Sequence, residues 1–176
     1  WRFEGLEFDL MSGGGRGIDM TTSAGRQLTV LNMYIHHAAI GVSVNGFVAT
    51  SPYDQIAIVG STVSQNTGTW NLYLFAYRLA ILGNVLTGGG SHSIRIETCQ
   101  GCVLSHNQVS GAGATAHALK FHAWAWGSAQ AAWNPGGTGQ YSEKIEISDN
   151  TFQSGNDEWM VGLGPQNNIS DERMRN

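Results

Sequence analysis

The chain has 176 residues, of which 41% are hydrophobic and only 12% are charged, with 24 glycines, 3 prolines and a formal net charge of −4. This composition predicts one folded domain with an apolar core, and it excludes a disordered or collagen-like chain. No run of lysine or arginine is present, and no stretch reaches the roughly 18 apolar residues that span a membrane, so neither nucleic acid nor a membrane is an expected partner.

Five ten-residue segments of the chain align without gaps. They begin, in chain order, at Leu28, Ile56, Leu79, Cys102 and Ile145. Each has apolar residues at its first, third and eighth positions, and three have asparagine at the sixth: Asn84, Asn107 and Asn150. Positions 61, 84 and 107 follow one another at intervals of 23 residues, which suits one coil of a β-solenoid.

The repeated asparagine predicts a structural ladder rather than a ligand site. Asparagine tolerates the left-handed backbone conformation that a turn after a strand needs. Stacked asparagine amides can also form hydrogen bonds from one coil to the next.

A second short strand recurs between these segments. Its copies begin at Gly17, Gly41, Asn71, Ser93, Ala118 and Trp159. Glycine, serine, threonine and asparagine between the strands supply the corners. We therefore expect an all-β chain with one domain over residues 1–176, a single-stranded right-handed parallel β-helix of about six coils. The longer interval before Asn150 predicts a tryptophan-rich loop insertion at residues 123–142.

A family resemblance follows from this pattern. The motif I-x-I-x-x-N, with the segments HSIRIETCQGCVLSHNQVSG and HALKFHAW, resembles the right-handed parallel β-helix repeats of the pectate-lyase-like superfamily over nearly the whole chain. The resemblance implies the fold, and by analogy it favours an extracellular or cell-surface location. It does not choose an activity, because polysaccharide lyases, glycoside hydrolases, phage tailspikes and adhesins share this fold.

The second strand predicts a polar outer face, because alternate side chains of a strand point to opposite sides. Three pairs are expected to point inward: Leu72 and Leu74, Ile94 and Ile96, Leu119 and Phe121. Adjacent coils lie about 4.8 Å apart. Two outer columns are therefore expected: Tyr73, Arg95 and Lys120 in one, and Phe75, Glu97 and His122 in the next.

Two interpretations of these columns remain open. In the first, Glu97 holds Arg95 and Lys120 in a structural salt-bridge network. In the second, the resemblance implies an acidic polysaccharide as ligand and a lyase reaction. Lys120 would then remove the proton beside the uronate carboxyl group, Arg95 would neutralise that group, and Tyr73 or His122 would protonate the leaving oxygen.

Three tryptophans of the insertion extend the ligand hypothesis. Trp124, Trp126 and Trp133 could stack on sugar rings beside Glu97, or they could simply pack the loop onto the solenoid. We expect no cofactor and no metal; the sequence has no outward aspartate cluster of the kind that holds calcium in pectate lyases. It also has no paired aspartates of the polygalacturonase kind, so lyase chemistry is favoured over glycosidase chemistry.

The remaining motifs have structural interpretations. His92 and His117 are expected to be partly buried corner residues, and the His36-His37 pair to lie in a turn. Cys99 and Cys102 are interpreted as structural thiols, with a disulfide or redox pair as the alternative. The uncapped ends predict either a piece of a longer solenoid or a homo-oligomer formed through an open end or an exposed sheet.

Overall fold

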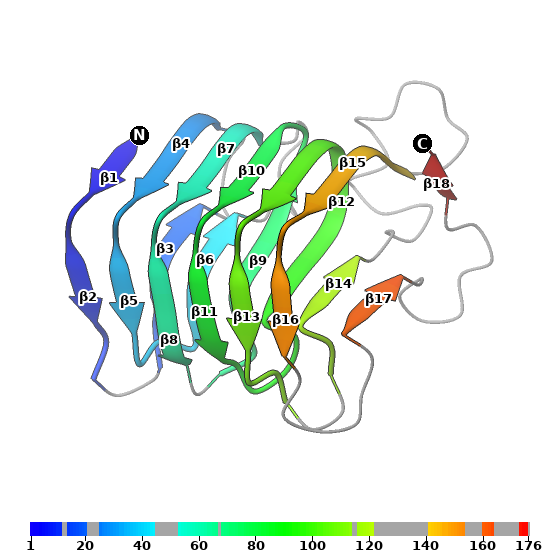
Figure 1. The fold of residues 1–176 in the computed structure, drawn as a ribbon. Coiled ribbons are helices and arrows are strands. Elements are labelled where there is room, and N and C mark those ends of the chain that lie inside the picture. Colours follow the sequence, from blue (N-terminus) through cyan, green and yellow to red (C-terminus); the bar gives the residue numbers. More distant parts are fainter. Residues whose placement is uncertain are drawn as a thin grey trace.

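The computed structural model describes residues 1–11, 14–20, 25–44, 53–66, 68–113, 116–121, 141–153, 160–163 and 173–175. Every regular element in these ranges is a β-strand, and the paired strands are parallel. The strands stack coil upon coil into a right-handed solenoid, with the N-terminal coil at one end (Figure 1). The predicted fold class is confirmed. These ranges contain no helix long and apolar enough to cross a membrane.

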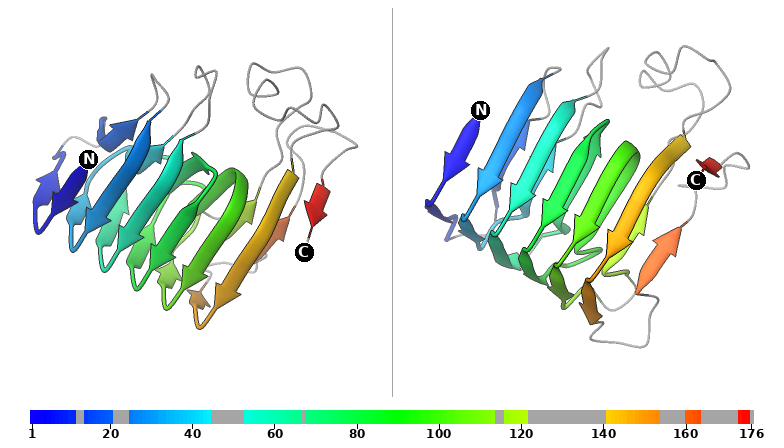
Figure 2. Two further views of the ribbon diagram at one scale, coloured as in Figure 1. Left: turned by 90° about the horizontal axis from the view of Figure 1, so that it is seen from above. Right: turned by 45° about the horizontal axis from the view of Figure 1, so that its top comes forward.

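Each coil contributes strands to three sheets, A, B and C (Figure 2). Sheet A contains β1 (Arg2–Glu4), β4 (Arg26–Leu31), β7 (Asp54–Val59), β10 (Leu79–Leu82), β12 (Ile94–Ser105), β15 (Tyr141–Ser148) and β18 (Arg173–Arg175). Sheet B contains β2 (Glu7–Asp9), β5 (Tyr34–His36), β8 (Thr62–Asn66), β11 (Val85–Gly88), β13 (Gln108–Ser110) and β16 (Thr151–Gln153). Sheet C contains β3 (Arg16–Met20), β6 (Ile40–Val44), β9 (Trp70–Ala76), the first part of β12, β14 (Leu119–Phe121) and β17 (Val161–Leu163).

The stacking is less extensive than about six equivalent coils. The stacked strands form about four turns. Tyr141 and Ser142, predicted as the end of the insertion, belong to β15 instead. The rest of the predicted insertion lies outside the described residues.

The predicted register is confirmed by the strand pairing. Leu79 lies opposite Ile56 on one side and Cys102 on the other, and Cys102 lies opposite Ile145. The first, third and eighth positions of the repeat fill the solenoid's interior in the middle coils, as Ile81 and Leu86 do. Ile147 is exposed, because β15 lies near the end of the stack.

A column of left-handed residues forms the turn between sheets A and B. Their φ angles lie between 50° and 64°, and the column consists of Gly5, Asn32, Gly60, Gly83, His106 and Asp149. These residues directly precede the ladder position of the repeat. The expectation that the ladder asparagine itself takes the left-handed conformation is therefore wrong. Its role is the hydrogen bonding of its side chain to the neighbouring coils.

The asparagine ladder runs through the buried side of this turn. The backbone N–H and the Nδ2 group of Asn84 both donate to Oδ1 of Asn107, at 3.0 Å each. Asn107 donates in the same way to Oδ1 of Asn150, at 2.9 and 2.8 Å. Nδ2 of Asn107 also donates to the carbonyl oxygen of Ile81. Since Asn84 and Asn107 are buried, these bonds form away from water.

The two cysteines lie at the bend of β12 between sheets C and A. Both are fully buried, and the structure pairs Cys99 with Cys102 as a disulfide with their Cα atoms 6.2 Å apart. The disulfide alternative, rather than free thiols, is therefore the arrangement observed.

Replacing Asn107 with alanine should destabilise the fold by about 2 to 4 kcal/mol, because it leaves buried groups of Asn84 and Ile81 without their hydrogen-bond partner. Denaturant unfolding followed by circular dichroism measures this loss. The matched control is Gln108→Ala at the next, exposed position, which should change the free energy of unfolding by only about 0.5 kcal/mol or less. Equal effects of the two variants would contradict a ladder that stabilises the fold.

Candidate functional site

Three neighbouring strands of sheet C bring the predicted outer column together. In β9, β12 and β14, Tyr73 lies opposite Arg95, and Arg95 lies opposite Lys120. The alternate residues of these strands, Leu72, Ile94 and Leu119 among them, are buried in the solenoid's core. The three polar side chains therefore lie on the outer side of sheet C, on three successive coils.

Arg95 forms a close ion pair with Glu97, two residues further along β12. Their Nε and Oε1 atoms are 2.5 Å apart, and the two side chains are 12% and 0% exposed. The expectation that Glu97 lies on an open surface is thus wrong, and the same holds for Phe75, which is fully buried outside the core cluster. Much of the positive charge of Arg95 is offset within the protein.

Burial shapes the electrostatics of Glu97. Loss of solvent raises the pKa of its carboxyl group, while the charge of Arg95 and hydrogen bonds from Arg95 and Tyr73 act in the opposite direction. Oε2 of Glu97 has no hydrogen-bond partner within the part of the chain that the structure describes. A buried carboxylate oxygen without a partner is costly, because nothing replaces the water that it loses.

Two aromatic rings surround the Arg95 guanidinium group. Its central carbon lies 5.1 Å from the ring centre of Trp70 and 5.4 Å from that of Tyr73. The two rings stack on each other with centroids 4.4 Å apart. Such cation–π contacts hold the guanidinium group in place. Trp70 was not predicted as a site residue, because its place in the strand pattern suggested an inward direction.

Lys120 lies at the end of this column, where it is half-buried. It has no ion-pair partner among the residues that the structure describes. Lys120 pairs in register with Gly162 of β17, and a methyl group added at Gly162 would lie 2.7 Å from Cδ of Lys120 and 2.4 Å from the ring of His117. A glycine at this position therefore leaves room for both side chains.

His92 and His117 lie beside the column, at the start of the same strands. Both are half-buried, and the N–H of His117 donates to Nδ1 of His92 at 2.9 Å. Neutral His92 thus carries its proton on Nε2. Burial, followed by the positive charges of His117, Arg95 and Lys120, lowers the pKa of His92 to about 4. His92 is therefore neutral at pH 7.

Four residues of the predicted site cannot be placed. His122, Trp124, Trp126 and Trp133 lie outside the described residues. The column of Phe75, Glu97 and His122 is thus described for its first two members only, and both are buried.

A second group of side chains was missed by the sequence analysis. Asp9, His36 and His37 converge at the ends of β2 and β5. The signal was present, because residues 1–10 also carry apolar side chains at their first, third and eighth positions. Aligned as a sixth copy of the repeat, they place Asp9 opposite His36, as the structure does.

Comparisons with protein-family models, with curated proteins and with solved structures found no match to this chain.

The ring of His92 should titrate with a midpoint near pH 4. Proton NMR of the histidine rings measures this value, and the signal is assigned by its loss in a His92→Gln variant. Because unfolded His92 takes up its proton near pH 6.5, its contribution to the free energy of unfolding is present above that pH and is lost as the pH falls toward 4. A midpoint at or above 6.5 would contradict the buried, neutral His92.

Proposed function

We propose that this β-solenoid binds an acidic polysaccharide along the outer side of sheet C, and that it is related to the pectate-lyase-like β-helix proteins that its repeat resembles. The observation that carries the proposal is the gathering of Trp70, Tyr73, Arg95 and Lys120 on β9, β12 and β14. The half-buried Trp70 ring can stack on a sugar face, and cations pair with uronate carboxylates; Tyr73 is buried and contributes by stacking on Trp70.

The charge of this surface supports an anionic ligand. Arg95 is paired with Glu97, His92 is neutral at pH 7, and Lys120 has no ion-pair partner among the described residues. Among the described residues, no acidic side chain therefore offsets the positive charge of Lys120. A polysaccharide that runs along the solenoid axis can contact it together with the half-buried Trp70 on β9, two coils away, because adjacent coils are about 4.8 Å apart.

Binding has more support than cleavage. A lyase needs a cation that neutralises the substrate's carboxylate, and the Arg95 guanidinium group already serves Glu97 at 2.5 Å. In a lyase reaction, Lys120 would act as the base, and Tyr73 or His122 would act as the acid.

Lys120→Ala should weaken binding of polygalacturonate or alginate about tenfold, the loss expected for about 1.4 kcal/mol of ion pairing. Isothermal titration calorimetry at low salt measures the affinity, and a neutral glucan serves as the ligand control. The matched protein control is Lys144→Asn. This substitution removes the chain's other lysine, which is exposed on β15, and asparagine tolerates the positive φ of that residue.

The same mixtures are followed for the ultraviolet absorbance of unsaturated uronate products. Products that form with the unaltered chain and not with Lys120→Ala would make the protein a lyase rather than a binding protein. Equal affinities of Lys120→Ala and Lys144→Asn, or no binding of any acidic glycan, would overturn the proposal.

The second candidate is a non-catalytic β-helix that serves adhesion or assembly. The buried Arg95–Glu97 pair favours it, because Glu97 offsets the charge of Arg95 without any ligand. Light scattering at micromolar concentration checks the associated expectation of a homo-oligomer, which a monomer would contradict.

A further inference from the structure

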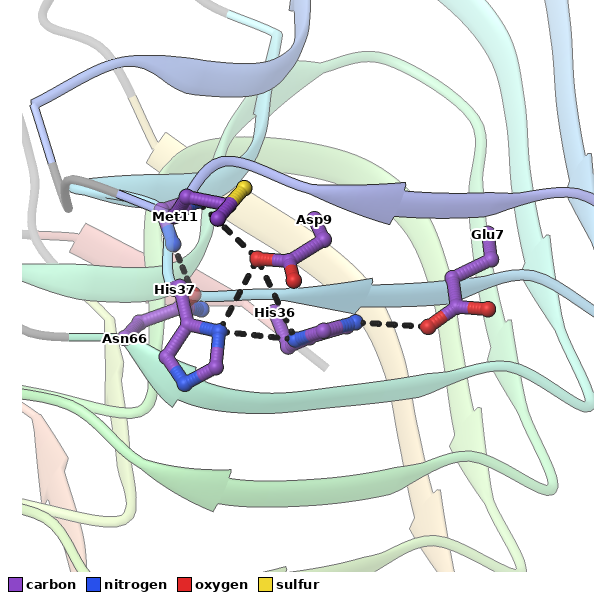
Figure 3. A network of polar contacts seen from close by, with 7 residues as sticks. Glu7, Asp9, Met11, His36, His37 and Asn66 are labelled. Atoms are coloured by element: carbon purple, nitrogen blue, oxygen red, sulfur yellow. Dashed lines mark hydrogen bonds and ion pairs between the residues drawn. The ribbon is translucent and has the colours of Figure 1, made fainter.

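The first two strands of sheet B place a cluster of electron-pair donors at their ends. β2 and β5 pair in parallel, with Asp9 directly opposite His36. His37 follows with a φ of 56°, which interrupts the alternation of side chains along the strand. Both imidazole rings consequently turn toward the Asp9 carboxylate (Figure 3).

Three atoms of this cluster lie close to one another. Nδ1 of His36 and Nδ1 of His37 are 2.9 Å apart. Oδ1 of Asp9 lies 3.0 Å from Nδ1 of His37 and 3.6 Å from Nδ1 of His36. Three ligands of a tetrahedral zinc ion, at bond lengths of about 2.0 to 2.1 Å, would be about 3.4 Å apart.

The hydrogen bonds around these three atoms decide which of them present lone pairs. Nε2 of His36 lies 2.9 Å from Oε1 of Glu7, a carboxylate that can only accept. Neutral His36 therefore carries its proton on Nε2, and its Nδ1 presents a lone pair. The backbone N–H of Met11 donates to Oδ1 of Asp9 at 2.9 Å, and one proton can lie between the two imidazole Nδ1 atoms, which are 2.9 Å apart. A cation would displace that proton, and each Nδ1 atom and Oδ1 of Asp9 would then offer it a lone pair.

We propose that Asp9, His36 and His37 bind a divalent transition-metal ion, with zinc as the representative ion. A cation between the three atoms accepts all three lone pairs at once. Two imidazole nitrogens and one carboxylate oxygen are a donor set that zinc and its first-row neighbours favour, whereas calcium and magnesium favour oxygen alone.

The surroundings hold the donors in position before any ion arrives. The Glu7 carboxylate orients the His36 ring through its outer nitrogen, as carboxylates do behind metal-bound histidines. The ring of Tyr34 stacks on that of His36 with centroids 4.3 Å apart. The N–H of Ala38 donates to Oδ1 of Asn66, which fixes the chain just after His37.

The site is open on one side. The side chain of His36 is 8% exposed, while those of His37 and Asp9 are 41% and 40% exposed. Three protein ligands with an open side leave a coordination position for water or another ligand. The ion would also join the first coil to the second, because Asp9 and His36 belong to adjacent coils. The site is separate from the outer side of sheet C, so the proposal does not depend on carbohydrate binding.

Calorimetric titration of the tag-free, chelator-treated chain with zinc chloride tests the proposal. One zinc ion should bind per chain, and it should raise the thermal unfolding midpoint, because it binds only the folded site. His37→Ala and Asp9→Asn should each weaken zinc binding at least about tenfold, and Glu7→Gln should weaken it about tenfold through the orientation of His36. The altered side chains of the first two variants are partly exposed, and circular dichroism verifies that each variant folds.

The matched control is His106→Asn. It removes an exposed histidine far along the solenoid and keeps a residue that tolerates the left-handed backbone at that position, so zinc binding should be unchanged. Cobalt(II) provides a second readout, since its visible absorption reports nitrogen and oxygen ligation and should disappear in His37→Ala. No saturable one-to-one binding, or equal affinities of His37→Ala, Asp9→Asn and His106→Asn, would overturn the metal site.

Discussion

Hydrogen bonding from each coil to the next is the interaction on which the rest of this structure depends. One coil alone has too little apolar surface to form a core, so stability comes from stacking against its neighbours. The parallel backbone bonds of three sheets and the Asn84–Asn107–Asn150 ladder all run in this one direction. The column of left-handed residues before the ladder keeps each turn in the same shape, so that successive asparagine amides meet.

Stacking also explains how residues far apart in the chain form sites. Arg95 and Lys120 belong to successive coils, as do Asp9 and His36, and in both cases strand pairing places them directly opposite each other. A side chain at one repeat position thus becomes part of a column. Both candidate sites lie where a column departs from the structural pattern, at Arg95 in sheet C and at His37 after β5.

The two sites manage buried polar groups in different ways. On sheet C, Arg95 and Glu97 form an ion pair, and the Trp70 and Tyr73 rings lie beside the guanidinium group. A buried ion pair of this kind is weak evidence for stability, because desolvation of both charges offsets their attraction. At the end of sheet B, Glu7 holds the outer nitrogen of His36, the N–H of Met11 donates to Asp9, and three possible ligand atoms lie within 4.8 Å of one another. On sheet C, the proposed ligand therefore binds mainly to Lys120. In the cluster of Asp9, His36 and His37, the proposed metal ion binds to the three side-chain atoms directly.

The sequence by itself determined the coil period, the strand register, the inward residues such as Leu72 and Ile94, and the outer column of Tyr73, Arg95 and Lys120. These follow from local rules, namely the alternation of side chains along a strand and the constant length of a coil. Only the tertiary structure decided that Glu97 and Phe75 are buried, that the residue before each ladder asparagine is left-handed, and that Asp9, His36 and His37 converge. Burial outside the core depends on what the neighbouring coils place over a side chain. The direction of a ring at a corner depends on a single φ angle. The repeat pattern encodes neither.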